Sequence, residues 1–245
     1  LDYMEKDGPG WDKYMRGMGE KCAWEIPLTP EQKAARLKRR PLLARAIAFA
    51  GNKHAEQTRK DKKETPYIEH LFAVCTALML TGEVTDQEIL AAAMLHDTLE
   101  DTETTPEELE NIFSARVRAL VEEVTDDKSL RKEERKYFQI EHASRLSKDA
   151  ALIKLADKIS NVSDIIFNPP RDWTVQRRED YLTWAEAVVA ECPHANPALK
   201  ERFGKLVAEG RALLGNPKLL RDTARIRRKE AEQACLEMVT RIPLS

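Results

Sequence analysis

Helix-start signatures recur along this chain, and each introduces a stretch whose apolar residues are spaced as on a helix. They begin at Thr29, Thr85 and Thr105, and in each the threonine is followed three residues later by glutamine or glutamate, which completes a capping box. Alternating β patterns are absent from the sequence, and 9 glycines in 245 residues leave few tight turns. We therefore predict an all-α fold, a compact bundle of about ten helices.

The predicted helices divide the chain into a main domain with an extension at each end. We predict an N-terminal extension over 1–40, a main domain over 41–200, and a C-terminal helical extension over 201–245 that packs on the same domain. Pro41 breaks the first helix and opens a second that runs to about Gln57, and Gly82 ends the helix after the charged loop 59–66. Further helices are predicted over 89–95, 115–125, 131–145, 148–167, 175–191, 197–214 and 217–240.

Charge balance and cysteine usage narrow the functional class. The 40 Lys and Arg against 42 Asp and Glu leave a net charge of −2, so no global field attracts nucleic acid or a membrane. No segment approaches the ~18 consecutive apolar residues of a membrane helix, and the charges throughout 1–24 are not those of a secretory signal. The four cysteines are far apart, so we expect a reducing, cytoplasmic compartment. The start at Leu1 is expected to be a trimmed one.

The stretch from His96 to Asp101 (His-Asp-Thr-Leu-Glu-Asp) concentrates chemistry-bearing side chains. Residues four apart share a helix face, so we predict that His96 stacks with Glu100 and Asp97 with Asp101. An adjacent histidine and aspartate can converge on one metal only where a helix end or a neighbouring ligand lets both point inward. The hexapeptide alone leaves two interpretations open, a metal site with two carboxylates near a water, or a polar helix end with solvated acids.

Two other positions favour the metal site. His70 lies at the mouth of an apolar helix, and Asp157 lies inside an otherwise apolar helical run. A buried, unpaired carboxylate is costly, so Asp157 needs a cation as its partner. Lys154 or Lys158 could be that partner, but a metal fits better once the histidines and Asp97 are counted together with Asp157.

The ordered set of these segments resembles the hydrolase domain of RelA/SpoT enzymes. The resemblance covers about residues 40–200 and is strongest to the small stand-alone alarmone hydrolases of the metazoan SpoT-homologue type. An adjacent histidine and aspartate (an HD pair) is a weak signal alone, whereas the ordered set of segments, spaced as they are along the chain, is highly specific. The residues that carry it are Arg59-Lys60-Asp61, 65–70, 96–101, 124–128, 134–136, 155–158 and Asn161.

The resemblance implies a compact HD-type helical domain with one divalent metal and a pair of catalytic acids. By this resemblance the metal ligands are His70, His96, Asp97 and Asp157. Such a mixed nitrogen and oxygen set suits Mn²⁺ in six-coordination, although Zn²⁺ or Fe²⁺ is not excluded by ligand type. Glu100 and Asp101 would orient or deprotonate the attacking water and help to protonate the leaving group, since adjacent acids raise one another's pKa.

The resemblance also implies the substrate contacts, which are Arg59, Lys60 and Asn161. Arginine can stack on a purine and hold phosphate through two hydrogen bonds. Tyr67 either packs on the ribose or fills the core. Ser163 stands where many relatives carry arginine, so one phosphate contact is missing, and Leu71 replaces the proline that usually follows the first ligand histidine.

The remaining histidines and charge runs have ordinary explanations. His54 is expected to play a structural or supporting role, and no partner of His142 or His194 is visible in the sequence. Lys62 and Lys63 are expected to be solvated. The basic run 225–229 is expected to be an exposed helix face, so nucleic-acid binding is not expected there.

Together these expectations predict metal-dependent hydrolysis of the 3′-pyrophosphate of guanosine tetra- or pentaphosphate, (p)ppGpp, giving GDP or GTP and pyrophosphate. No synthetase domain fits in the rest of 245 residues, so the chain is expected only to degrade the nucleotide. One alternative is a phosphatase for another nucleotide, such as the 2′-phosphate of NADPH. Another is a catalytically silent nucleotide-sensing module. Oligomerisation, a lid or a partner are the open roles for the two extensions.

Overall fold

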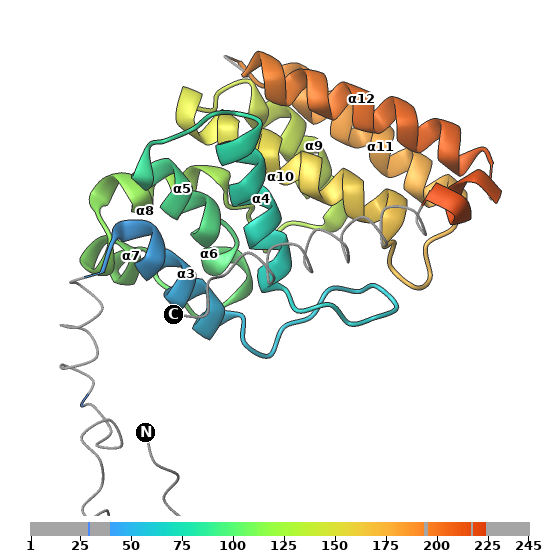
Figure 1. Cartoon of the computed structure of the whole chain (residues 1–245). Coiled ribbons are helices and arrows are strands. Elements are labelled where there is room, and N and C mark those ends of the chain that lie inside the picture. The colour runs from blue at the N-terminus through green and yellow to red at the C-terminus, as the bar shows by residue number, and fades with distance from the viewer. Residues whose placement is uncertain (1–28, 30–39, 194–195, 217, 224–245) are drawn as a thin grey trace, which may run out of the picture. The chain divides into compact units, whose positions relative to one another are not determined.

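The computed structural model describes residues 29, 40–193, 196–216 and 218–223, in which helices pack around one long helix, α10 (Figure 1). The described residues form ten helices and no strand, which confirms the predicted all-α class. These are α3 (Leu42–Lys53), α4 (Ile68–Leu80), α5 (Gln87–Leu95), α6 (Thr98–Asp101), α7 (Pro106–Ile112), α8 (Ala115–Val124), α9 (Lys132–Ala143), α10 (Lys148–Phe167), α11 (Val175–Glu191) and α12 (Pro197–Leu214).

Side-chain caps explain where several helices begin. Thr105 Oγ1 accepts a hydrogen bond from the Glu108 amide at 3.2 Å, as its capping signature predicts. The cap of α5 is Asp86 and not Thr85, because Asp86 Oδ1 accepts from the amides of Glu88 and Ile89. An aspartate carries two acceptor oxygens and displaces the threonine by one position. The helix predicted to start at Thr29 lies outside the described residues, as does most of 217–240.

Helix α10 is the central helix of the domain. It packs against α4, α5, α8, α11 and α12 (Figure 1), and apolar residues surround it along most of its length. Its C-terminal end is capped by buried Arg178 of α11, whose guanidinium donates to the carbonyls of Ile165 and Ile166. Gly210 of α12 lies so close to α10 that an added Cβ would overlap Ile166. The position of α10 is therefore fixed at its end and along one side.

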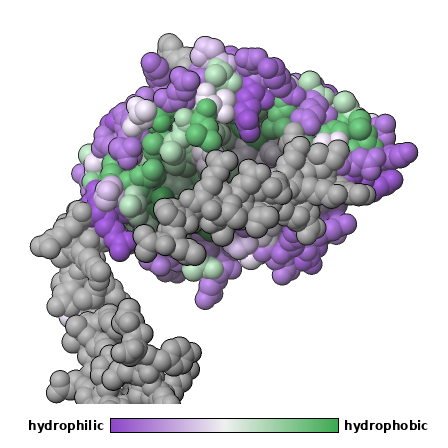
Figure 2. Space-filling model, in the orientation of Figure 1, coloured by the Kyte–Doolittle hydropathy of each residue, from purple (hydrophilic) through white to green (hydrophobic). Residues whose placement is uncertain are grey.

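Helix boundaries follow the sequence expectations closely, with local differences. Helix α3 ends at Lys53, earlier than the predicted Gln57. Cys75 and Cys192 are free and buried, while Cys22 and Cys235 lie outside the described residues. None of the described helices is long and apolar enough to cross a membrane. Hydrophilic residues cover much of the rim of the face in Figure 2, and hydrophobic residues gather nearer its middle.

Candidate active site

A break between two helices turns adjacent side chains toward the same point. Helix α5 ends at Leu95, His96 is its C-cap, and Asp97 is the N-cap of the short helix α6. Thr98 stabilises the break, since its hydroxyl donates to the Leu95 carbonyl at 2.6 Å. His96 and Asp97 therefore lie at the boundary between two helices and not within one helix with Glu100 and Asp101, and the helix end that their convergence needs is present.

Four predicted ligand side chains, from α4, the α5–α6 junction and α10, converge at this point. His96 Nε2 lies 3.2 Å from Asp97 Oδ2 and 3.7 Å from Asp157 Oδ1. His70 Nε2 lies 3.3 Å from Asp157 Oδ1 and 3.7 Å from Asp97 Oδ2. The tightest group is His70, His96 and Asp97, whose donor atoms all lie within 4.8 Å of one another. Asp157 is outside that group but approaches both histidines.

Both imidazoles are oriented by hydrogen bonds at the nitrogen that points away from the carboxylates. His70 Nδ1 lies 2.9 Å from Ser160 Oγ, and His96 Nδ1 lies 2.8 Å from the Ala93 carbonyl oxygen. His96 Nε2 is buried and has no hydrogen-bond partner among the described residues. Histidines that bind metals are held in this way, with one nitrogen fixed and the other aimed at the ion. The donor set therefore fits a divalent cation.

The electrostatics of the cluster favour two ionised carboxylates. Burial opposes charge on His96, but Asp97 and Asp157 outweigh it and raise the pKa of His96 to about 10. Burial alone would raise the pKa of Asp97 and of Asp157. His96 beside Asp97, and Lys158 beside Asp157, instead hold both pKa values well below the usual range. Two buried anions facing two imidazoles form a strong attraction for a cation.

Asp157 has a lysine partner as well as the two histidines. Lys158 Nζ donates to Asp157 Oδ2 at 3.2 Å, and Asn161 Nδ2 donates to Oδ1 at 2.5 Å. Lys158 also lies over the ring of Trp184, 4.6 Å from its centroid. Lys154, the other lysine considered from the sequence, instead donates to the Val124 carbonyl at 3.0 Å. The lysine occupies one oxygen of Asp157 and leaves the other facing the histidines.

Tyr67 has a contact that neither sequence interpretation predicts. Its hydroxyl donates to Asp97 Oδ2 at 2.6 Å, and its ring stacks on buried His54 with centroids 5.0 Å apart. Burial and the neighbouring Asp97 carboxylate raise the pKa of Tyr67, so the phenol stays a donor. His54 Nδ1 in turn lies 2.7 Å from Gln57 Oε1, a contact that suits a supporting residue. Tyr67 therefore orients Asp97.

The two predicted acids lie on α6, beside the cluster. Glu100 Oε1 lies 3.7 Å from Arg135 Nη1 and 3.9 Å from Lys128 Nζ. Asp101 forms an ion pair with Lys128. Burial, followed by the carboxylates of Asp126, Asp97 and Asp101, raises the pKa of Glu100 to about 7. A carboxyl with this pKa can both accept and release a proton near neutrality.

The predicted substrate contacts lie at a neighbouring pocket. Arg59 Nη2 donates to Asn161 Oδ1 at 3.3 Å and to Asp164 Oδ2 at 2.5 Å. Lys60 is exposed, and its carbonyl accepts from the Arg171 amide at 3.2 Å. No pattern in the sequence indicated a role for Asp164. The pocket has a volume of about 240 Å³ and is lined by Thr58, Arg59, Lys60, Asp61, Tyr67, Asn161, Asp164, Ile165, Asn168, Pro170, Trp173 and Tyr181.

Comparisons with known proteins place this arrangement in context. A family model described as HD domain matches residues 46–186. The chain is 46% identical to guanosine-3′,5′-bis(diphosphate) 3′-pyrophosphohydrolase MESH1 of Danio rerio over 168 residues, covering 69% of this chain and 93% of that protein. For the protein of the same name from Homo sapiens the identity is 47% over 164 residues, covering 67% and 92%.

A solved structure is also similar. It is described as a metazoan ortholog of SpoT that hydrolyzes ppGpp and plays a role in starvation responses. The similarity has a TM-score of 0.67 at 42% sequence identity, over 69% of this chain and 96% of that chain. The present chain covers this solved structure almost completely, as it does the two relatives.

Proposed function

This chain belongs to the HD-domain family and to its guanosine-3′,5′-bis(diphosphate) 3′-pyrophosphohydrolases, and from that membership we propose that it removes the 3′-pyrophosphoryl group of (p)ppGpp. The products are GDP or GTP and pyrophosphate. The observation that carries the proposal is the convergence of His70, His96, Asp97 and Asp157 beside two acids. The names of the relatives favour this reaction over the NADPH phosphatase and the silent sensor.

The metal chemistry is proposed from the donor set. His70, His96, Asp97 and Asp157 would hold one divalent cation, and we propose Mn²⁺ because the donors are a mixture of nitrogen and hard oxygen. When bound, such a cation lowers the pKa of a water and polarises a phosphoryl oxygen. Ser160 holds the His70 imidazole in place for this role, and Tyr67 holds the Asp97 carboxylate.

Glu100 and Asp101 are proposed to move the protons. As the water oxygen bonds to phosphorus and the bond from phosphorus to the ribose 3′-oxygen breaks, Glu100 takes a proton from the water. The ribose 3′-oxygen needs a proton, which Glu100 can return because its pKa is raised to about 7. Asp101, tied to Lys128, is placed to orient the water. Pyrophosphate therefore leaves with the water oxygen.

The nucleoside is proposed to occupy the pocket beside Arg59. Trp173, Tyr181 and Tyr67 give this pocket aromatic walls, which suit a purine and its ribose. Arg59 and Lys60 supply positive charge for the 5′-phosphates, and Asn161 supplies an amide at the boundary with Asp157. The cytoplasmic location, the division into three segments and any oligomer remain predictions from the sequence.

A nucleotide panel tests the proposed reaction. Purified protein is incubated with Mn²⁺ and either ppGpp, pppGpp or NADPH, and the products are separated by chromatography. We expect pyrophosphate together with GDP or GTP, and no orthophosphate. Release of orthophosphate from NADPH alone, or no product from any nucleotide in a metal-loaded preparation, would refute the proposal.

Replacing Tyr67 with phenylalanine tests how Asp97 is oriented. The ring stacked on His54 is kept, and the hydrogen bond to Asp97 is lost. Because supporting hydrogen bonds of this kind tune metal affinity, we expect a loss of about 10-fold or more in affinity for Mn²⁺. Metal titration of the apo protein measures it. Unchanged affinity would show that the Tyr67 hydroxyl does not support the site.

A further inference from the structure

Four cations form ion pairs with carboxylates at the candidate site. Three of them also donate a hydrogen bond within the described residues: Lys158 to Asp157, Arg59 to Asp164, and Lys128 to Asp101. Arg135 differs. Its Nη1 lies 3.7 Å from Glu100 Oε1, too far for a hydrogen bond.

The guanidinium of Arg135 borders Glu100 through Nη1 and has an unsatisfied donor at Nε. Its Nε is buried and has no hydrogen-bond partner among the described residues. Gln139, one turn further along α9, has a buried Oε1 in the same state. The full side chain of Arg135 is only partly exposed, at 29%, so water satisfies it incompletely. A guanidinium held in this way is suited to bind an oxyanion.

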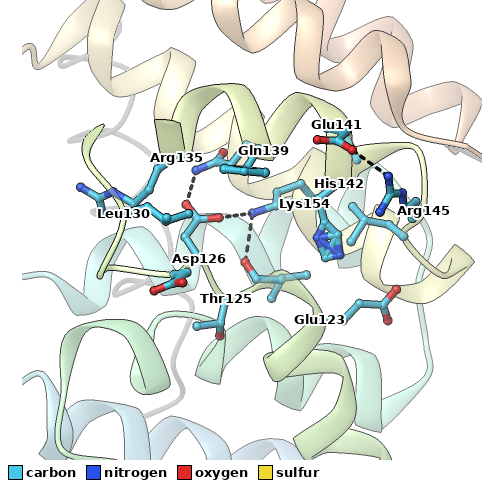
Figure 3. Close-up of a pocket in the computed structure, with 15 residues that line it drawn as sticks. Glu123, Thr125, Asp126, Leu130, Arg135, Gln139, Glu141, His142, Arg145 and Lys154 are labelled. Atoms are coloured by element: carbon cyan, nitrogen blue, oxygen red, sulfur yellow. Dashed lines mark hydrogen bonds and ion pairs between the residues drawn. The ribbon is translucent and has the colours of Figure 1, made fainter. Parts of the chain in front are cut away.

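The polar groups next to Arg135 contact one another. Figure 3 shows Arg135 and Gln139 on α9, next to Asp126 and Lys154, in a pocket of about 380 Å³. Asp126 accepts a hydrogen bond from Gln139 and lies 3.7 Å from the nearly buried Nζ of Lys154. Asp126 is thus occupied by other partners, and the carboxylate that pairs with Arg135 among the described residues is Glu100.

The substrate of the proposed reaction carries a negative charge for which the contacts described so far supply no partner. A pyrophosphoryl group has a second phosphate beyond the one that is attacked, and that distal phosphate adds negative charge near Glu100. Arg59 is committed to Asn161 and Asp164, on the nucleoside side. Arg135 comes from a different helix and borders the acids directly.

We propose that Arg135 contacts the distal phosphate of the 3′-pyrophosphoryl group, and that this contact selects a pyrophosphate over a single phosphate. The inference rests on the proposed function and adds a specificity-determining residue to it. Arginine can supply two parallel hydrogen bonds to one phosphate. A monophosphate held at the metal would not extend as far as Arg135.

The test compares Arg135→Gln with wild type on two kinds of ligand. For ppGpp we expect kcat/KM to fall about 10- to 100-fold. Affinity for inorganic pyrophosphate, measured by calorimetry on the metal-loaded protein, should fall similarly, while affinity for orthophosphate changes less than about 3-fold. Arg135→Lys keeps the charge but not the two parallel donors, so its affinity for pyrophosphate should lie between those of wild type and Arg135→Gln. It also shows whether the loss in Arg135→Gln is a folding defect.

Arg145→Gln is the matched control, because Arg145 lines the same pocket but is exposed, lies just beyond the end of α9 and pairs with Glu141 of that helix. It should behave as wild type. Equal losses of Arg135→Gln for pyrophosphate and orthophosphate would overturn the inference, since they would mean a general effect through Glu100. If wild type leaves ppGpp untouched, the proposed function fails, and the pyrophosphate titration still decides on Arg135.

Discussion

Asp157→Ala is expected to abolish metal retention and to lower turnover of ppGpp by about 1,000-fold or more. Asp157, like Asp97, faces both His70 and His96. Without it the cluster loses one of its two anions and the proposed ligand that comes from α10. Metal content after dialysis and kcat with excess Mn²⁺ measure the effect, and a variant that keeps both would remove Asp157 from the site.

A loss of folding must be separated from a loss of metal. Lys158 is buried beside Asp157, and an uncompensated buried charge costs about 3–5 kcal/mol. The double variant Asp157→Leu with Lys158→Met replaces the pair by apolar groups, so it should regain stability while staying inactive. Asp149→Ala is the control on the same helix, because Asp149 pairs with Arg116 away from the site. It should keep both metal and activity.

Glu100→Gln is expected to keep the metal and to lose about 100- to 1,000-fold in kcat. The amide is similar in shape but cannot exchange a proton at neutral pH. Glu100 is not one of the proposed ligands, so metal content should match wild type. A variant with the normal rate would exclude Glu100 from proton transfer.

The same substitution should change stability in a pH-dependent way. The folded-state pKa of Glu100 is raised to about 7, mainly by burial, from an ordinary value of 4.5. The folded state therefore prefers the neutral acid, and wild type loses stability as pH rises from the lower value to the higher one. Metal-free Glu100→Gln should be more stable than wild type by roughly 2–3 kcal/mol at pH 8. At pH 4 the two should be alike in urea unfolding, and a difference there would contradict this account.

The sequence predicted those parts of the molecule that depend on local pattern. The bounds of α10, α11 and α12 agree with the predicted 148–167, 175–191 and 197–214. These helices have clear apolar spacing and strong caps, such as Ser147, Thr174 and Asn196. The four proposed ligand residues were predicted from a resemblance in their order and spacing along the chain, and the fold brings their side chains close together.

What the sequence could not predict depends on contacts between distant segments. The hydrogen bond from Tyr67 to Asp97 joins residues 30 apart, and that from Arg59 to Asp164 joins residues 105 apart. The approach of Arg135 to Glu100 likewise joins α9 to α6. The predicted helix over 89–95 ends at Leu95, as α5 does, but the sequence did not indicate that Thr98 donates to the Leu95 carbonyl at this end.

Helix α10 holds the Asp157 carboxylate, the Ser160 support of His70, and the Asn161 and Asp164 partners of Arg59. A shift of α10 along its axis would therefore displace the proposed metal ligand and the proposed nucleoside contacts together. On mild heating, metal retention and nucleotide binding should be lost over the same temperature range. Gly210→Ala, whose added methyl group would overlap Ile166 of α10, should therefore weaken both properties together.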